Sequence, residues 1–232
     1  MTVRDLRVSA GSLNLNGFTL TVTEDLNLSG GTISNGIIQG NDIEEVQNTQ
    51  FNGPFTLTKT GNNNDTWSGS NQFNGTTNIT NLSNSQIVWQ GNNQFNGNTL
   101  ITNNGNGLFR FANTNGDTFS GVVVFQNNGN NFIDIAYRGN NNFAQSITIN
   151  NTNPAGEIRF GDQGGTSTLS TGGLLTTNFA VGTILEINNF TQVQNVANGT
   201  FGVDDFFVTN SIFQGDFSVT TTDDLIFYVY PQ

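Results

Sequence analysis

The stretch NQFNG at residues 71–75 recurs unchanged at residues 93–97, and this recurrence decides the fold. Its phenylalanine belongs to a series with steps of 22, 22, 24 and 24 along the chain: Phe51, Phe73, Phe95, Phe119 and Phe143. A second apolar series has the same steps: Leu57, Ile79, Ile101, Phe125 and Ile149. A third has steps of 22, 22 and 24: Trp67, Trp89, Phe111 and Ile135. Because the three series keep step, one unit of about 22–24 residues carries all three positions.

Each apolar position lies in a short stretch that alternates between apolar and other residues. Examples are LFRF at residues 108–111 and IDIAY at 133–137, a pattern typical of half-buried strands. Asn/Gly clusters at 61–64 and 103–107 separate these stretches, and such residues form tight corners. Three short strands per unit predict one coil of an all-β parallel β-helix, or β-solenoid. About ten coils, stacked about 4.8 Å apart, give a rod about 48 Å long.

Two other all-β folds compete with this prediction. A β-sandwich has no fixed sequence period, and a propeller blade takes about 40 residues. Stacked coils also explain the composition, because each coil buries its apolar face only against its neighbours. The predicted core is therefore the three apolar series, with Asn side chains at equivalent corners hydrogen-bonded from coil to coil.

Charges recur at one position of the predicted coil. Each of four charged residues stands between apolar neighbours, at steps of 24, 25 and 27 along the chain: Arg110, Asp134, Arg159 and Glu186. We expect an outward-facing ladder of alternating charge, and four unrelated surface charges are the alternative. Each exposed ion pair between neighbouring charges of such a ladder contributes well under ~1 kcal/mol to the free energy of unfolding.

The overall charge excludes several classes of partner. The net charge is −11, and six dispersed cations provide no basic face for nucleic acid or an anionic membrane surface. No run of 18 apolar residues predicts a membrane-spanning helix. No apolar signal core follows Met1, so we expect either no cleaved leader or a mature fragment with an added methionine. Cys and His are absent, which removes thiol chemistry and most zinc sites.

Two stretches near the N-terminus resemble repeats of bacterial surface adhesins and autotransporter-like passengers. They are GSLNLNGFTLTVT at residues 11–23 and LNLSGGTISNG at 26–36. The resemblance covers residues 1–50 closely and 51–150 loosely. It implies a right-handed parallel β-solenoid that serves as a stalk, a filament or an adhesive surface. It carries over no binding residues.

The chain divides by composition into three parts. We expect N-terminal coils over residues 1–50, central solenoid repeats over 51–200, and a C-terminal cap or subunit-docking segment over 201–232. The last segment departs from the repeat and is crowded with aromatic residues, of which six are predicted to dock another subunit: Phe206, Phe207, Phe213, Phe227, Tyr228 and Tyr230. A cap that folds over the last coil is the alternative.

We expect no catalytic residues and no enzymatic activity. The segment NTNG at residues 113–116 is similar to one signature of galacturonase-like enzymes but has Asn115 where they have an acid. Adjacent carboxylates point to opposite faces of a strand, so they form poor hydrolytic pairs; these are Glu44/Glu45, Asp204/Asp205 and Asp223/Asp224. The stacked Trp67 and Trp89 could bind a glycan if exposed, but their alignment with Phe111 favours the core.

We expect no cofactor, with a structural calcium ion as an alternative. Its candidate ligands are the acidic groups Asp204/Asp205, Asp223/Asp224 and Asp42/Glu44/Glu45.

The leading functional hypothesis is a non-enzymatic structural or adhesive protein, extracellular or on the cell surface. It assembles with itself into a fibre or layer, or presents an adhesive face, with a surface glycan as a further partner. The alternatives are a virion appendage that binds host glycan and a polysaccharide-acting β-helix enzyme.

Overall fold

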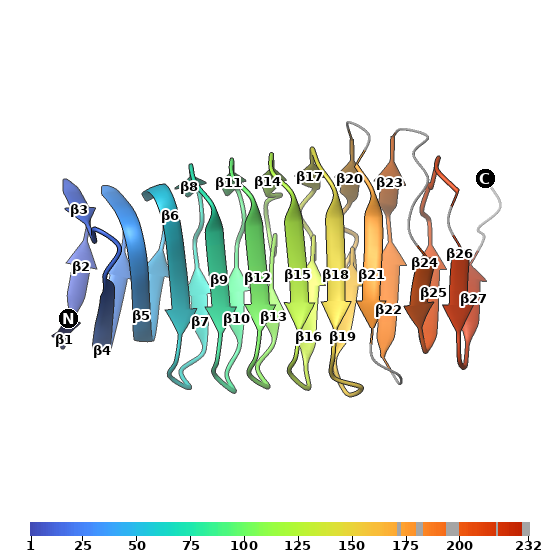
Figure 1. Ribbon diagram of the computed structural model, residues 1–232, viewed down its shortest axis with the longest axis horizontal. Coiled ribbons are helices and arrows are strands. Elements are labelled where there is room, and N and C mark those ends of the chain that lie inside the picture. The colour runs from blue at the N-terminus through green and yellow to red at the C-terminus, as the bar shows by residue number, and fades with distance from the viewer. Residues whose placement is uncertain (171–172, 180–182, 194–199, 217, 229–232) are drawn as a thin grey trace.

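A computed structural model describes residues 1–170, 173–179, 183–193, 200–216 and 218–228, and every element in them is a β-strand. Within these residues, no helix is present that could cross a membrane. The strands lie side by side along a rod, with β1 and β27 at opposite ends (Figure 1).

The described strands form three sheets. The first has 17 strands: β1 (Thr2–Val3), β2 (Leu6–Val8), β3 (Ser12–Asn14), β4 (Thr19–Leu28), β5 (Thr32–Val46), β6 (Gln50–Lys59), β8 (Gln72–Phe73), β9 (Thr77–Asn81), β11 (Gln94–Phe95), β12 (Thr99–Asn103), β14 (Thr118–Phe119), β15 (Val123–Asn127), β17 (Asn141–Phe143), β18 (Ile147–Asn151), β20 (Ser167–Leu169), β21 (Leu175–Phe179) and β23 (Phe190–Gln192). The second has eight: β7 (Asp65–Trp67), β10 (Ile87–Trp89), β13 (Phe109–Arg110), β16 (Phe132–Ile135), β19 (Glu157–Phe160), β22 (Ile184–Asn188), β25 (Asp205–Thr209) and β27 (Leu225–Tyr228). The third pairs β24 (Thr200–Val203) with β26 (Ser218–Thr221).

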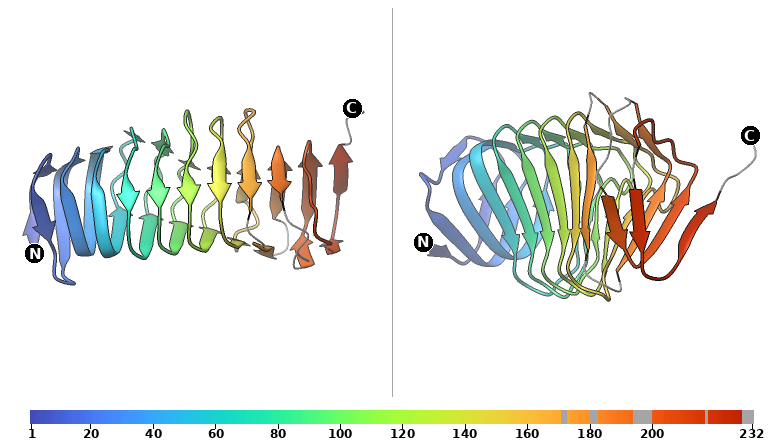
Figure 2. Two further views of the ribbon diagram at one scale, coloured as in Figure 1. Left: turned by 90° about the horizontal axis from the view of Figure 1, so that it is seen from above. Right: turned by 45° about the vertical axis from the view of Figure 1, so that its right-hand side comes forward.

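Strand pairing in the described chain is parallel and joins each coil to the next. Phe73 pairs with Phe51 of the preceding coil and with Phe95 of the following one. Phe119 pairs in the same way with Phe95 and Phe143. Figure 2 shows the coils following one another along the rod. The predicted parallel β-helix of about ten coils is therefore confirmed. The parallel pairing across these coils rules out the hairpins that a sandwich or propeller would need.

The first coils differ in one respect from the predicted three short strands. Strand β5 runs through a corner for 15 residues, and β4 and β6 have ten residues each. The corners here lack the longer Asn/Gly clusters of the later coils. The backbone therefore bends within a continuous strand, with a register shift between Ser34 and Gly36 where β5 pairs with β6.

The Phe series forms a stack of parallel rings inside the rod. The ring centroids of Phe73 lie 4.5 Å from Phe51 and 4.7 Å from Phe95, with interplanar angles of 4° in both cases. The stack continues to Phe119 and Phe143, and the five rings are at most 1% exposed. Strand spacing sets this geometry, because in-register side chains on neighbouring parallel strands lie about 4.8 Å apart.

The other two apolar series lie in the same core. Leu57, Ile79, Ile101, Phe125 and Ile149 pair in that order along the long strands. Trp67 pairs with Trp89, whose ring lies 5.8 Å from that of Phe111. Both tryptophans are fully buried, so they are core residues and cannot bind a glycan where they stand.

Candidate functional site

Four charged residues of the eight-stranded sheet lie in one register. Arg110 pairs with Asp134, Asp134 with Arg159, and Arg159 with Glu186, on strands β13, β16, β19 and β22. Their apolar neighbours point into the core, so alternation directs the charged side chains outward. The sequence pattern predicts this order of charges, and the strand register reproduces it.

The ladder is less exposed than expected. The side chain of Asp134 is only 1% exposed, and those of Arg110 and Arg159 are 20% and 21% exposed. Arg110 covers Asp134, with Nε 3.0 Å and Nη2 2.9 Å from Oδ2. The expectation of a solvent-exposed ladder is therefore wrong at Asp134, because the longer arginine side chain of the preceding coil lies over the short carboxylate.

Two aromatic rings complete the site, and the sequence analysis did not select them. The guanidinium carbon of Arg110 lies 3.5 Å from the ring centroid of Tyr137, and that of Arg159 lies 3.7 Å from Phe132. Both contacts lie within the range of cation–π attraction. The charged–aromatic strip consists of Arg110, Phe132, Asp134, Tyr137, Glu157, Arg159 and Glu186. An aromatic residue within three positions of an outward charge is the signal that would have identified it.

Glu157 is a further member that sequence reasoning missed. Its Oε2 accepts a hydrogen bond from Arg159 Nε at 2.7 Å, whereas Glu186 Oε2 lies 3.7 Å from the same nitrogen. Glu157 and Arg159 are two positions apart on β19, so their side chains share one face. The closest acid to Arg159 is therefore on its own strand.

Burial dominates the electrostatics of two acids of the strip, Asp134 and Glu186. It raises the pKa of Asp134 above its ordinary value, although the charge of Arg110 opposes the shift. Burial likewise raises the pKa of Glu186, against the charge of Arg159. A half-buried surface that holds cations, carboxylates and ring faces together can bind a polar partner by hydrogen bonds and stacking.

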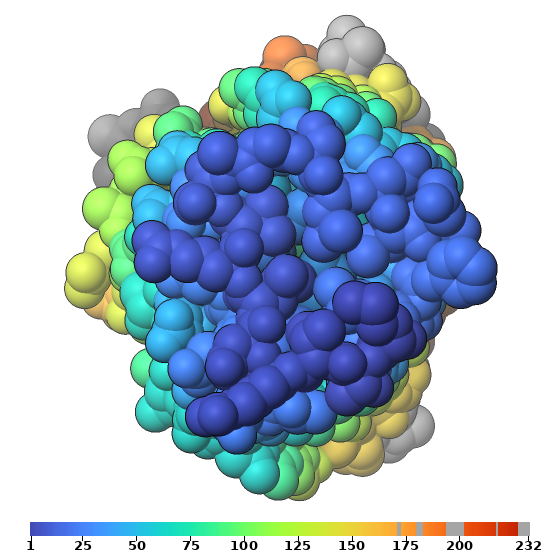
Figure 3. Space-filling view, turned by 90° about the vertical axis from the view of Figure 1, so that its left-hand side faces the viewer, coloured from blue at the N-terminus to red at the C-terminus, as the bar shows by residue number. Residues whose placement is uncertain are grey.

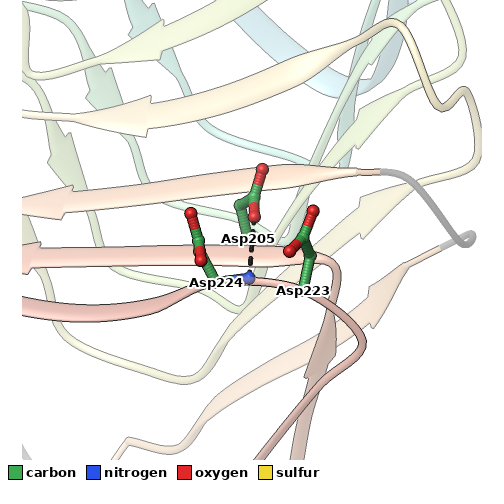
Figure 4. A group of neighbouring side chains, drawn as sticks. All are labelled: Asp205, Asp223 and Asp224. Atoms are coloured by element: carbon green, nitrogen blue, oxygen red, sulfur yellow. Dashed lines mark hydrogen bonds between the residues drawn. The ribbon is translucent and has the colours of Figure 1, made fainter.

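The last two described coils bring three carboxylates together (Figure 4). Asp205 begins β25, and Asp223 and Asp224 precede β27; one carboxylate oxygen of each lies within 4.8 Å of the others. The amide of Asp224 donates to Asp205 Oδ1 at 3.0 Å. The charge of Asp224, and then that of Asp205, raises the pKa of Asp223.

This acidic trio joins Asp205 to the predicted group Asp223/Asp224 and leaves out Asp204, the other member of the predicted Asp204/Asp205 group. Its oxygens are of the type that calcium prefers. The third predicted group, Asp42 with Glu44 and Glu45, forms no such cluster in the described part of the chain. Phe206 pairs with Leu225 on the next coil. Asp205 directly precedes Phe206, and Asp224 directly precedes Leu225, so the two aspartates also lie side by side.

The predicted docking residues lie in different environments. Phe206 is fully buried in the core and pairs with Leu185, so its prediction as a docking residue is wrong. Phe207 points away from that core and is half-buried, and Phe213 stacks on Phe190 with ring centroids 5.6 Å apart. Tyr230 and the side chains of Phe227 and Tyr228 lie outside the described residues. Docking through the remaining residues stays a prediction.

A buried ion pair, Lys59 with Asp65, lies outside the strip and was also missed. The two side chains are 0% and 1% exposed, and Nζ lies 2.6 Å from Oδ2. The signal that would have identified it is alternation, because Lys59 is two residues after the inward Leu57 and Asp65 is two residues before the inward Trp67.

Comparison of the chain with models of protein families, with curated proteins and with solved structures finds no match.

Proposed function

We propose that this protein is a non-enzymatic structural β-solenoid, extracellular or on a cell surface, that assembles end to end with copies of itself. The observation that carries the proposal is the parallel pairing of strands along the rod, whose outermost strands each have one paired edge in the described chain. In the described chain, β1 pairs only with β4, β3 pairs only with β5, and β27 pairs only with β25. Unpaired strand edges are templates for further pairing.

Exposed apolar residues at the first coil support the same proposal. Met1 is 81% exposed and Phe18 is 72% exposed. Together with Leu13, Leu15 and Leu20 they line a hollow of about 290 Å³, on the end of the rod that faces the viewer in Figure 3. A second copy that covers this end would bury the apolar surface and continue the pairing of strands. Such a contact is heterologous, because it joins two different surfaces of the molecule, and its repetition generates a filament.

The net charge opposes this contact. Each copy carries a net charge of −11, so two copies repel one another as they approach. We therefore expect assembly to increase with ionic strength, because salt screens exposed charges within a few ångströms at molar concentration.

Negative-stain microscopy and sedimentation of the purified chain test the proposal. We expect filaments or end-to-end oligomers at high protein concentration in molar salt, and fewer of them in dilute buffer. Uniformly monomeric particles under both conditions would contradict assembly.

The charged–aromatic strip favours a second role, adhesion to a surface glycan. The guanidinium groups of Arg110 and Arg159 lie over the rings of Tyr137 and Phe132, and these stacked planar groups, with the paired carboxylates beside them, offer hydrogen-bonding and stacking surface to a sugar. A virion appendage that binds host glycan is the corresponding alternative, and a stable threefold oligomer without filaments would favour it. The acidic trio keeps a polysaccharide-acting enzyme as the remaining alternative, to be tested by release of reducing ends from a glycan panel.

A further inference from the structure

The Lys59–Asp65 pair closes the first Asn/Gly corner of the rod. Lys59 ends β6 and Asp65 begins β7, so the two residues flank the corner at residues 60–64. Lys59 is the one lysine of the chain. Apart from each other, Nζ and the Oδ2 atom it faces have no hydrogen-bond partner in the described structure.

The following coils build the same corner without charges. Lys59 pairs in register with Asn81, and that position is Asn103 and Asn127 in the next two coils. In those coils the Asn side chain donates to a corner carbonyl, as Asn103 Nδ2 does to Gly107 O at 3.0 Å. Asp65 pairs with Ile87, an apolar core residue. The corner therefore forms without an ion pair, and a fully buried pair carries a desolvation penalty that its attraction only partly offsets.

We propose that Lys59 and Asp65 condense into an intramolecular amide that links β6 to β7. Within the pair, a proton moves from the Lys59 ammonium to the Asp65 carboxylate. The lone pair of the neutral Nζ then attacks Cγ of the carboxylic acid. A Cγ–Nζ bond forms, a Cγ–O bond breaks, and the departing hydroxyl group leaves with the second amine proton as water. No oxidant, reductant or other reactant is consumed.

The site favours the proton transfer and the attack. Burial raises the pKa of Asp65 to about 6, even against the hydrogen bond and charge of Lys59, so the protonated acid is accessible near neutral pH. A desolvated lysine is a stronger nucleophile than a hydrated one, and the fold holds the two groups in contact. The product is a neutral amide, which removes two charges from the core.

Mass measurement of the wild-type protein tests the proposal directly. The intact denatured chain should weigh one water molecule less than its sequence requires. Trypsin, which cleaves after free lysine and arginine, should then release residues 8–110 as one cross-linked species instead of the separate peptides 8–59 and 60–110. A chain of full mass would overturn the proposal. So would a loss of water with normal cleavage after Lys59, because a succinimide at an aspartate would give that result.

Matched variants assign the lost water to this pair. Lys59→Arg keeps the positive charge but replaces the amine by a poor nucleophile, and Asp65→Ala removes the acid. Both should have full mass and yield two peptides. Asp134→Asn alters the ion pair with Arg110, whose guanidinium does not condense in this way, and should still lose the water. Loss of water in Lys59→Arg would contradict the assignment. Because the wild-type measurement stands alone, a variant that fails to fold does not affect the test.

Discussion

Among single residues, Asp117 differs from its neighbours in a buried column of asparagines. Asn71 Nδ2 donates to Asn93 Oδ1 at 2.9 Å, and Asn93 Nδ2 donates to Asp117 Oδ1 at 2.8 Å. Continuing the column would require Asp117 to donate to Asn141, but a carboxylate only accepts. Asp117 Oδ2 has no partner in the described structure. A protonated Asp117 is an isostere of asparagine and would restore the missing donor.

Burial raises the pKa of Asp117 from 3.8 to about 7, although hydrogen bonds from Asn93 oppose the shift. The folded state therefore binds the proton more tightly than the unfolded chain. The protonated Asp117 therefore stabilises the folded state. This contribution to the free energy of unfolding is fully present below about pH 4 and is lost as pH rises through about 7. We expect Asp117→Asn to remove this loss. Above pH 8 it should be more stable than the wild type by up to about 4 kcal/mol.

Urea unfolding of both proteins between pH 4 and pH 9 would measure this difference. The two free energies should converge at the acidic end, where the wild-type carboxyl holds its proton. A constant difference across the whole range would show that folding does not raise the pKa of Asp117.

At the scale of elements, the short strands that carry the Phe stack combine backbone pairing with close packing of their side chains. Strands β8 and β11 have two residues each, and backbone bonds join β11 to both neighbouring coils: Gln94 N donates to Asn71 O, and Ser120 N donates to Phe95 O, at 2.8 Å each. Phe95 stacks on Phe73 and on Phe119, with ring centroids 4.7 Å and 4.6 Å away. It also contacts Trp89 edge to face at 6.1 Å. The core therefore transmits a change in one ring to the coils on both sides.

We expect Phe95→Ala to reduce the free energy of unfolding by about 3–5 kcal/mol, because it leaves a cavity in a closed stack. Urea titration followed by tryptophan fluorescence would measure it, since both tryptophans lie in the neighbouring core. Asn96→Ala is the matched control on the exposed side of the same corner and should change stability by about 0.5 kcal/mol or less. Equal effects of the two substitutions would argue against the Phe stack as the main support.

At the scale of the whole molecule, the last coils differ from the rest of the rod because their acidic groups have no basic residue among them. The Asp205, Asp223 and Asp224 side chains lie together near the last coil, and like charges on adjacent strands destabilise a sheet. In the middle of the rod, by contrast, Arg110 and Arg159 pair with the carboxylates beside them. Ionic strength should therefore have a larger effect on the last coils than on the charged–aromatic strip.

We expect Asp224→Asn to raise the midpoint of thermal unfolding at neutral pH. Asp224 is the largest contributor to the raised pKa of Asp223, so removing its charge relieves repulsion in the folded state. Because the groups are exposed, molar salt should reduce the difference between variant and wild type. A midpoint that falls in the variant, or a difference unaffected by salt, would indicate that Asp224 has another role in this coil.

The sequence by itself determined the fold, the register and the core. Period and alternation are properties of position along the chain, and stacking in parallel follows because each coil buries its apolar face only on its neighbours. Phe73 and Phe95 could therefore be placed in contact without coordinates. The same register put Arg110, Asp134 and Arg159 in line.

The tertiary structure alone decided what happens at corners and on covered surfaces. Alternation gives the direction of a side chain within a strand but not at an Asn/Gly corner, where the backbone torsions set it. Lys59 and Asp65 lie within strands, two residues from the inward Leu57 and Trp67, so alternation does place both on the inner face; only the structure shows that they meet across the corner. Burial of Asp134 depends on how far Arg110 extends over it, and the acidic trio depends on the path of the last coils. These features arise from contacts between coils in three dimensions, whereas the repeat specifies only which residues become neighbours.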